Sequence, residues 1–445
     1  MIFNSKLEKF FFFDFPVCLF SLIPFFLITG PFLSDFAISL ISVIFITYCI
    51  NKKNFSYFKK KYFYYFLAFW LYLLLNSLIN NPNFDSIKIS LFFFRFGVFV
   101  IAITAFLEFD IKFIKYFFYV IFLCFLVLII DGFYQYFFDE NIIGMKKSNS
   151  FRVSSFFGNE LILGSYLSRL WPIFFGLSIL ILNKKNKLFY FLILIFILSE
   201  VLIFLSGERV SFFYINLSAI FIIILSNNLF KLRLVTMLCS LFIIVIISYF
   251  NTSAKDRIIN KTISQMNLVQ KDNQKDNQKD NQKDNQKENN KIKKINNLKE
   301  IHIFTKQHTH MYITAYRIYL DNKVFGIGVK NFRNLCDDPR YELSKMSCSN
   351  HPHNSYLQLL TETGIIGFAF LMITFLYFCK YAIKHAINKL GKKFFFTDFE
   401  VCILSGILIY LWPFVPTGNI FNNWLNIIIV LYVPFLIWSR KLSKS

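Results

Sequence analysis

Apolar runs of about 20 residues recur along nearly the whole chain, and this feature limits the possible folds more than any other. A helix of that length crosses the roughly 30 Å of hydrocarbon in a bilayer. Hydrophobic residues make up 56% of the 445 positions, which excludes an ordinary soluble globule. The sequence therefore predicts an all-α integral membrane protein with about 12 transmembrane helices. Hydropathy places these helices at residues 11–30, 33–50, 62–80, 90–109, 113–137, 160–182, 188–205, 210–226, 234–250, 365–380, 400–414 and 421–438.

Basic residues in the short segments gather on one side of the predicted helices. They lie mainly at residues 1–10, 51–61, 110–115, 183–187, 227–233, 380–393 and 440–445. The positive-inside rule makes these segments, and both termini, cytoplasmic. In a soluble protein the net charge of +22 would suggest nucleic acid. Here its location indicates membrane lipids as partners and no nucleic acid.

The predicted topology divides the chain into three parts. Residues 1–250 hold helices 1–9, residues 251–364 form an external loop between helices 9 and 10, and residues 365–445 hold helices 10–12 with a basic cytoplasmic tail. The N-terminal apolar stretch has no small-residue cleavage site, so we interpret it as helix 1 instead of a signal peptide. A long loop translocates largely regardless of its charge, so its own basic residues do not contradict this topology.

The external loop has two dissimilar halves. Residues 271–290 repeat Lys-Asp-Asn-Gln without any apolar residue, so we expect a disordered insert that is dispensable for activity. A ligand-binding array is the alternative. Residues 301–364 regain apolar positions and form the predicted catalytic segment. An amphipathic helix is expected around Met311–Leu320, ending before a turn at Gly326 and Gly328.

Four ionisable residues lie well inside predicted spans: Arg95, Asp131, Arg169 and Glu200. Such residues are costly in hydrocarbon and indicate a functional site. In the predicted orientation all four lie in the outer half of the membrane, which favours a polar cavity that opens outward. The alternative is a pair of structural ion pairs, Arg169 with Glu200 and Arg95 with Asp131.

Two further arginines are predicted to face the same side. Arg209 ends the turn Ser206-Gly207-Glu208-Arg209 between helices 7 and 8, and Arg317 lies on the amphipathic helix of the loop. A guanidinium binds phosphate bidentately, so the two residues suit a phosphate-bearing ligand. The alternative is that each arginine extends to a lipid headgroup.

His353 is the candidate general base. It lies in His351-Pro352-His353-Asn354, directly before a short helix that Asn354 or Ser355 should cap and Gly364 should end. A helix N-terminus lowers the pKa of an imidazole and keeps it neutral, as a base requires. His351 precedes Pro352, which favours extended backbone, so its ring is expected to project away from His353.

The remaining histidines and cysteines define two further expectations. Five of the six histidines fall in the external loop, but their spacing matches no zinc pattern, so we expect neither a metal nor a cofactor. Cys336 and Cys348 are the two cysteines of the loop, and an oxidising compartment would permit a disulfide between them. Two free thiols are the alternative.

The residues around His353 resemble the signature of bacterial O-antigen ligases, whose superfamily also holds O-antigen polymerases. The matching positions are His353-Asn354, Gly364 and Gly367. Arg317 followed by Val324-Phe325-Gly326-Ile327-Gly328 resembles the Arg and glycine turn of the family. Upstream, Gln135 and Arg152 to Asn159 resemble its entry to the middle helices.

This resemblance implies a metal-independent membrane glycosyltransferase in the bacterial inner membrane. It would move a glycan from a polyprenyl-diphosphate carrier to a lipid A–core or similar lipid or glycan acceptor at the outer face. His353 would be the base, and Arg209 and Arg317 would bind the diphosphate. Supporting roles are expected for Asn354, Glu362, Gly364, Arg95, Arg152, Arg169 and Gln135.

Two departures from the family pattern leave the reaction open between ligase and polymerase. Phe213 stands where the ligase motif R-x3-L, starting at Arg209, has Leu, and Val324 stands where Pro is usual before the glycine turn. A polymerase would use the same donor with a second lipid-linked glycan as acceptor. A transporter or lipid-glycan flippase is the alternative of a different class, although no inverted repeat or pair of broken helices is evident.

Overall fold

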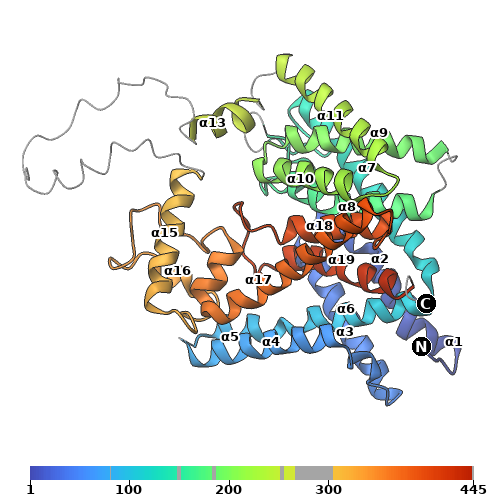
Figure 1. Ribbon diagram of the computed structural model, residues 1–445, viewed down its shortest axis with the longest axis horizontal. Helices are drawn as coiled ribbons and strands as arrows, with labels where there is room; N and C mark the ends of the chain where they lie inside the picture. Colours follow the sequence, from blue (N-terminus) through green and yellow to red (C-terminus); the bar gives the residue numbers. More distant parts are fainter. Residues whose placement is uncertain (81, 148–151, 183–186, 251–254, 266–303, 443–445) are drawn as a thin grey trace, which may run out of the picture.

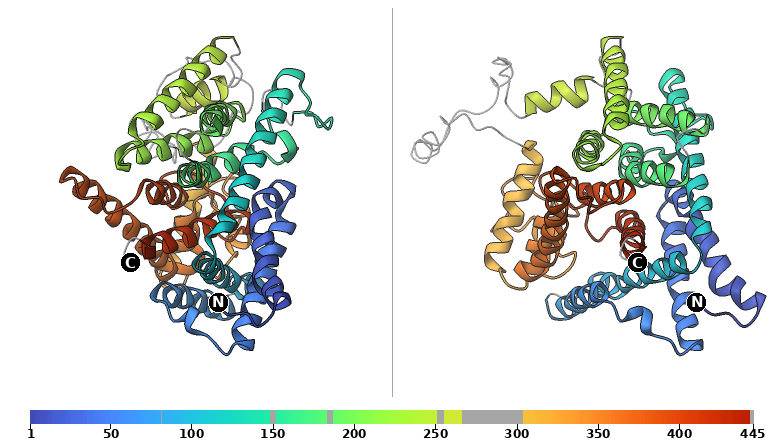
Figure 2. Two further views of the ribbon diagram at one scale, coloured as in Figure 1. Left: turned by 90° about the vertical axis from the view of Figure 1, so that its right-hand side faces the viewer. Right: turned by 45° about the vertical axis from the view of Figure 1, so that its right-hand side comes forward.

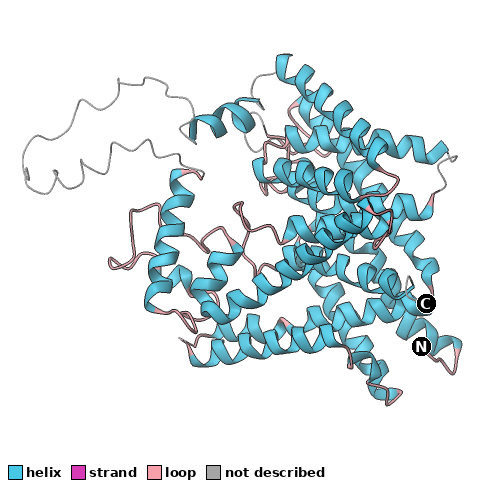
Figure 3. Cartoon of the chain, viewed as in Figure 1, coloured by secondary structure: helices cyan, strands magenta, loops and turns pink. Residues whose placement is uncertain are grey.

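The computed structural model describes residues 1–80, 82–147, 152–182, 187–250, 255–265 and 304–442. Within these residues the chain forms helices and loops without strands, as Figure 3 shows, apart from one isolated bridge between Glu140 and Lys146. The predicted all-α class of membrane protein is therefore confirmed. The Lys-Asp-Asn-Gln repeat at 271–290 lies outside the described residues.

Each of the twelve predicted spans overlaps with helical residues of the structure. The N-terminal half contains α1 Lys6–Lys9, η1 Phe10–Asp14, α2 Phe15–Thr29, α3 Pro31–Asn51, α4 Lys61–Ile79, α5 Phe84–Phe92, α6 Phe94–Phe109 and α7 Ile114–Phe138. The remainder contains α8 Leu163–Ile181, α9 Lys187–Leu205, α10 Arg209–Leu225, α11 Phe230–Phe250, η5 Asp256–Asn260, α13 Lys261–Gln265, α15 Lys306–Asp321, α16 Phe332–Leu335, α17 Ser355–Leu390, α18 Asp398–Tyr410 and α19 Asn423–Leu442.

Ten helical stretches of the described residues are long and apolar enough to cross a membrane. The other two predicted spans correspond to shorter helices, α10 with 17 residues and α18 with 13. A capping box between Thr397 and Glu400 starts α18. The helix ends before Pro413 and Pro416, because proline disfavours helical backbone in the residue before it. The chain that follows is a loop, which reaches the candidate site described below.

Helix α8 lies at the centre of the membrane bundle. It packs against α7, α9, α10 and α18, and nearly every side chain from Leu163 to Ser178 is buried. Trp171 and Tyr166 are its largest fully buried side chains. Arg169 and the serines of α8 would be costly in contact with lipid, so burial among other helices suits its sequence. The N-terminus of α8 is therefore held in place where it meets the candidate site described below.

The sequence correctly predicted the start of α17 and its break. Asn354 caps the helix by accepting hydrogen bonds from the amides of Tyr356 and Leu357. Gly364 has φ 64° and bends the helix, so the predicted short helix and the following span form one element with a kink. A Cβ at Gly364 would collide with the backbone of Val324, which leaves only glycine for this position.

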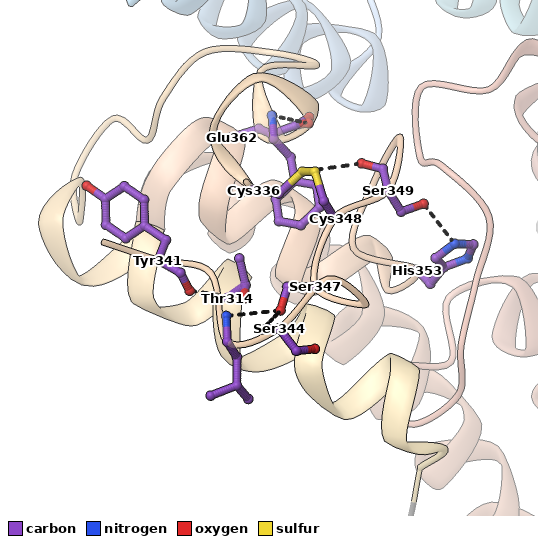
Figure 4. The surroundings of a disulfide bond; sticks show 11 residues. Thr314, Cys336, Tyr341, Ser344, Ser347, Cys348, Ser349, His353 and Glu362 are labelled. Atoms are coloured by element: carbon purple, nitrogen blue, oxygen red, sulfur yellow. Dashed lines mark hydrogen bonds between the residues drawn. A yellow bond between two sulfur atoms is a disulfide. The ribbon is translucent and has the colours of Figure 1, made fainter. Parts of the chain in front are cut away.

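Residues 304–354 form a small unit that packs on α17 through α15. Its core contains Ala315, Ile318 and Phe332. The predicted amphipathic helix is confirmed as α15, and Cys336 and Cys348 are joined by a disulfide (Figure 4). Figures 1 and 2 place this unit at one end of the molecule, whereas both chain termini lie toward the opposite end.

Candidate functional site

A cavity of about 1370 Å³ lies where the membrane bundle meets the 304–354 unit. The α9–α10 turn, the region of η5 and α13, the N-terminal end of α15 and the loop after α18 form most of its wall, and α8, the loop that carries Arg152 and the residue His353 complete it. Its lining includes Arg152, Ser165, Arg169, Gly207, Glu208, Arg209, Val210, Ser211, Phe213, Arg257, Thr262, Phe304, Thr305, Lys306, Gln307, His308, Thr309, His310, His353, Phe414, Val415, Pro416, Thr417 and Gly418.

The turn Ser206–Arg209 anchors two arginines of this cavity. The Nε of Arg152 donates to the carbonyl of Ser206 at 3.0 Å, and the Nε of Arg257 donates to the carbonyl of Gly207 at 2.9 Å. Gly207 has φ 67°, and a Cβ there would lie 3.0 Å from Cδ of Arg257. The turn therefore needs glycine both for its backbone and for the space that the arginine side chains fill.

Glu208 fixes the same turn to the N-terminus of α8. Its carboxylate accepts hydrogen bonds from the amides of Gly164 at 2.7 Å and Ser165 at 2.9 Å, and from the hydroxyl of Ser211 at 2.8 Å. These amides belong to the first turn of α8, which has no intrahelical partners for them. Burial raises the pKa of Glu208 to about 7, while these hydrogen bonds and nearby Arg152 oppose the shift.

Arg169 reaches the cavity from inside the bundle. Arg169 is only 7% exposed, and its guanidinium lies 4.6 Å from the ring centroid of Tyr214. Among the described residues, its Nε and Nη1 have no hydrogen-bond partner. A buried cation without a carboxylate is costly, so this position favours an anionic ligand.

The lining is strongly basic. It contains five Lys and Arg residues against one carboxyl, that of Glu208. The five are Arg152, Arg169, Arg209, Arg257 and Lys306. Phe213, Phe304 and Phe414 add an apolar side. The cavity thus combines the features that a ligand with an anionic head and an apolar part requires.

The backbone around His353 is held from two elements. Its carbonyl accepts a hydrogen bond from the amide of Thr417 at 2.8 Å and one from the hydroxyl of Tyr312 at 3.3 Å. Its Nε2 lies 3.3 Å from the hydroxyl of Ser349, next to the disulfide (Figure 4). Burial lowers the pKa of His353, so the ring is neutral near pH 7, the state that a general base needs.

Two further histidine rings lie beside His353. The ring centroid of His308 is 5.5 Å away and that of His351 is 4.2 Å away. The expectation that His351 projects away from His353 is wrong, because His353 adopts a left-handed φ of 54° that reverses the chain direction. Burial lowers the pKa of His308 and of His351 to about 4 each. No group of three His, Cys, Asp or Glu residues in the described part of the chain is arranged to hold a metal.

Arg317 does not line the cavity, contrary to its predicted pairing with Arg209. Its Nη1 donates to the carbonyls of Tyr341 and Glu342, each at 3.4 Å. The N-terminal end of α15 faces the cavity, whereas Arg317 lies toward the C-terminal end and packs on the 304–354 unit. Arg257 occupies the place beside Arg209 that the sequence assigned to Arg317.

Gln135 supports the site from a distance. Its Oε1 accepts hydrogen bonds from the amides of Ser154 and Ser155, each at 2.8 Å, and its Nε2 donates to the carbonyl of Met145. These bonds fold the loop that carries Arg152 toward the cavity. Gln135 itself is fully buried and does not line the cavity.

Glu362 and Gly364 also act outside the cavity. The carbonyl of Glu362 accepts a hydrogen bond from the amide of Gly328 at 2.8 Å, and its carboxylate accepts one from Gln358 at 3.1 Å. The glycine turn thereby packs onto the kink of α17. These residues hold the 304–354 unit on the membrane bundle.

The two ion pairs considered as the alternative for the ionisable residues inside the bundle are wrong. Arg95 pairs with Asp35 at 2.7 Å and lines a separate cavity of about 300 Å³. Glu200 pairs with Arg233 on α11. Asp131 instead accepts hydrogen bonds from the amide of Ile142 and the hydroxyl of Ser155. Hydropathy does not reveal which helices are neighbours, so charge alone could not select these pairs.

Sequence reasoning missed Arg257, Lys306, His308 and the loop of residues 414–418. Arg257 lies a few residues after the ninth predicted span. No local pattern distinguishes it from the other basic residues of the long loop. His308 was grouped with histidines of unmatched metal spacing. The prolines at 413 and 416 were the available signal for the loop, because they disfavour a helix that continues to residue 414.

Residues 192–372 match the family model described as O-antigen ligase. The match runs from α9 to the kinked part of α17 and so includes Arg209, Arg257, His308 and His353 of the cavity. No curated protein matches the chain. The match covers less than half of the chain; it supports the resemblance to the O-antigen ligase superfamily, in a protein whose described helices are those of a multi-pass membrane protein.

Proposed function

We propose that this protein, as a member of the O-antigen ligase superfamily, transfers a glycan from a polyprenyl-diphosphate carrier to a hydroxyl of a lipid A–core or similar acceptor, without a metal ion. The supporting observation is the excess of basic side chains over carboxyls in the cavity lining. In the described part of the chain, five basic residues of the lining face one carboxyl, and Arg169 is buried over Tyr214 without a carboxylate partner. A bound diphosphate would supply negative charge to balance this excess.

Arg152, Arg209 and Arg257 would bind the diphosphate, with Arg169 behind them. Two of these side chains are anchored through Nε to adjacent carbonyls of one turn, which fixes the direction of each guanidinium. Cations oriented before the ligand arrives stabilise developing charge without reorganisation. Arg257 replaces Arg317 in this proposal, because Arg317 contacts carbonyl oxygens outside the cavity.

His353 would accept the proton of the acceptor hydroxyl. The acceptor oxygen forms a bond to the anomeric carbon of the glycan while the bond from that carbon to the phosphate oxygen breaks. The electron pair of the broken bond stays on the diphosphate, and the proton moves to His353. Its lowered pKa keeps the ring unprotonated before the reaction, as the role of base demands.

The proposed setting is the bacterial inner membrane, with the cavity at its outer face and both termini in the cytoplasm. The positive-inside rule supports this orientation. The opposite placement of the termini and the 304–354 unit in Figure 1 agrees with it. A reporter fused at Asn285 should be active outside the cytoplasm. Activity of that fusion only in the cytoplasm would overturn the orientation and the proposed reaction with it.

A reconstituted transfer assay tests the function. The purified protein in lipid nanodiscs with EDTA receives a polyprenyl-diphosphate glycan and either lipid A–core or a second lipid-linked glycan. Product on lipid A–core supports a ligase, and a lengthened carrier-linked glycan supports a polymerase instead. Movement of the glycan across a vesicle membrane without release from its carrier would refute transfer and support a flippase. Transfer that EDTA abolishes and zinc restores would refute metal independence.

Matched variants connect this activity to the cavity. Arg169→Gln should weaken donor binding and transfer. Arg340→Gln is the control, because Arg340 is exposed and pairs with Asp338 outside the cavity. Equal effects of the two variants would contradict a donor site at Arg169.

A further inference from the structure

His308 is an imidazole of the cavity that the proposed reaction leaves without a role. It lies in the first turn of α15, whereas His353 precedes α17, so two distant parts of the chain bring their rings together. The centroids are 5.5 Å apart and the ring planes are inclined by 71°. Both residues line the same cavity. His308 is therefore a second imidazole that can contact the bond between the anomeric carbon and the phosphate oxygen, which breaks in the proposed reaction.

Thr305 fixes which nitrogen of His308 can face a ligand. The hydroxyl oxygen of Thr305 accepts a hydrogen bond from the backbone amide of His308 and lies 2.9 Å from its Nδ1. A hydroxyl both donates and accepts, so this oxygen can give its own proton to Nδ1 while it accepts the amide proton. In this arrangement Nδ1 is the acceptor, and the neutral ring carries its proton on Nε2. Nδ1 faces Thr305, the N-cap of its own helix. Nε2–H is therefore the group that can donate a hydrogen bond to a ligand in the cavity.

His308 is also within electrostatic reach of both halves of the site. Burial, together with smaller effects of His353 and Arg209, lowers its pKa to about 4. The other ring packed beside it belongs to Tyr312, with centroids 6.1 Å apart. His308 therefore stays neutral near pH 7 and donates a hydrogen bond without competing with His353 for the acceptor proton.

We infer that His308 is a catalytic residue that donates a hydrogen bond from Nε2 to the phosphate oxygen leaving the anomeric carbon. This inference rests on the proposed function. The diphosphate would lie on the arginines and the acceptor hydroxyl at His353, so the bond that breaks lies between these groups. In the step, the carbon–oxygen bond breaks with its electron pair on the phosphate oxygen, and the acceptor proton goes to His353. The proton of His308 stays on the ring, because a hydrogen bond suffices to stabilise the developing charge.

The test measures single-turnover transfer at saturating donor in nanodiscs. His308→Ala should lower the rate by about 100-fold, the effect typical of losing one donor to a developing oxyanion. The dissociation constant of the donor should change less than about threefold, since the bond strengthens only as charge develops. His308→Gln keeps an N–H group at a similar reach and should recover about tenfold of the lost rate. Tyr316→Ala, an exposed position on the same helix, should retain the wild-type rate.

Donor analogues with different leaving groups distinguish a catalytic role of His308 from a structural role. Two donor analogues carry CH₂ or CF₂ in place of the oxygen between the phosphorus atoms, and CF₂ gives the better leaving group. Loss of His308 should reduce transfer from the CH₂ donor more than transfer from the CF₂ donor. Equal reduction with both donors, or a wild-type rate for His308→Ala, would overturn the inference. Failure of the wild-type protein to transfer from the natural donor would instead reject the proposed function.

Discussion

Replacing Arg169 with methionine should stabilise the ligand-free protein and weaken donor binding. In the ligand-free protein the guanidinium is 7% exposed, and Nε and Nη1 lack partners among the described residues. A buried donor without a partner costs about 1–3 kcal/mol. The cation–π contact with Tyr214 offsets this cost by about 0.5–2 kcal/mol. Methionine fills similar space without these donors, so the free energy of unfolding should rise by about 1–2 kcal/mol.

The same substitution removes a charged partner of the donor diphosphate. A hydrogen bond to a charged group contributes about 1.5–3 kcal/mol. The dissociation constant of the donor should therefore rise about 10- to 150-fold, since 1.4 kcal/mol corresponds to a factor of ten. Intrinsic fluorescence during thermal unfolding, with and without donor, measures both effects in one preparation. The donor should raise the midpoint of the wild type more than that of Arg169→Met.

Arg233 provides the matched control. It is also a fully buried arginine over an aromatic ring, 4.3 Å from the centroid of Trp171, but it pairs with Glu200. Arg233→Met should lower the free energy of unfolding by about 3–5 kcal/mol, because it leaves the Glu200 carboxylate buried without its partner. Its donor affinity should stay at the wild-type value. A less stable Arg169→Met with unchanged donor affinity would refute the reasoning and make Arg169 a structural residue.

Three further predictions concern the rest of the site. Arg257→Ala should raise the donor dissociation constant at least tenfold in a binding titration, whereas Arg317→Ala should change it less than about threefold; a reversed order would restore Arg317 to the diphosphate site. The transfer rate should stay constant as pH falls from 8 to about 6.5 and should decline only below it, because burial lowers the pKa of His353 and the neutral ring is the active form. A pH–rate profile that declines already above pH 7 would contradict this. Cys348→Ser should lower the transfer rate with the donor affinity unchanged, because the disulfide holds the loop on which Ser349 meets His353, and a wild-type rate would show that this contact is dispensable.

Local signals in the sequence predicted the fold near His353 well. Asn354 as a cap, the break at Gly364 and the amphipathic pattern of α15 each depend on residues a few positions apart. Backbone conformation was the exception. The extended preference before Pro352 was a sound local rule, but the left-handed backbone of His353 overrode it and brought His351 against His353.

Partners across the bundle could not be predicted, because they depend on which helices touch. Arg95 and Asp131 had similar predicted depths, yet Asp35 on α3 is the residue that reaches Arg95. The position of Arg257 in the cavity could not be predicted for the same reason. Its role became visible only because the residues after α11 return to the α9–α10 turn, about 50 positions earlier in the chain.

The structure of the α9–α10 turn leads us to expect that changes within the turn are more damaging than the substitution at Phe213. Its carbonyls at Ser206 and Gly207 anchor Arg152 and Arg257, and Glu208 fixes it to the first amides of α8. The spacing of the cations is thus set by adjacent peptide groups of a turn that is fixed to the largely buried helix α8, which gives the preorganisation that charge stabilisation requires. Phe213, which replaces the leucine of the motif, lies one helical turn after Arg209 and contributes an apolar wall of the cavity. Under the proposed function, the arginine and the glycine turn before it would carry the chemistry of the motif, and the fourth position would shape the apolar side of the ligand site.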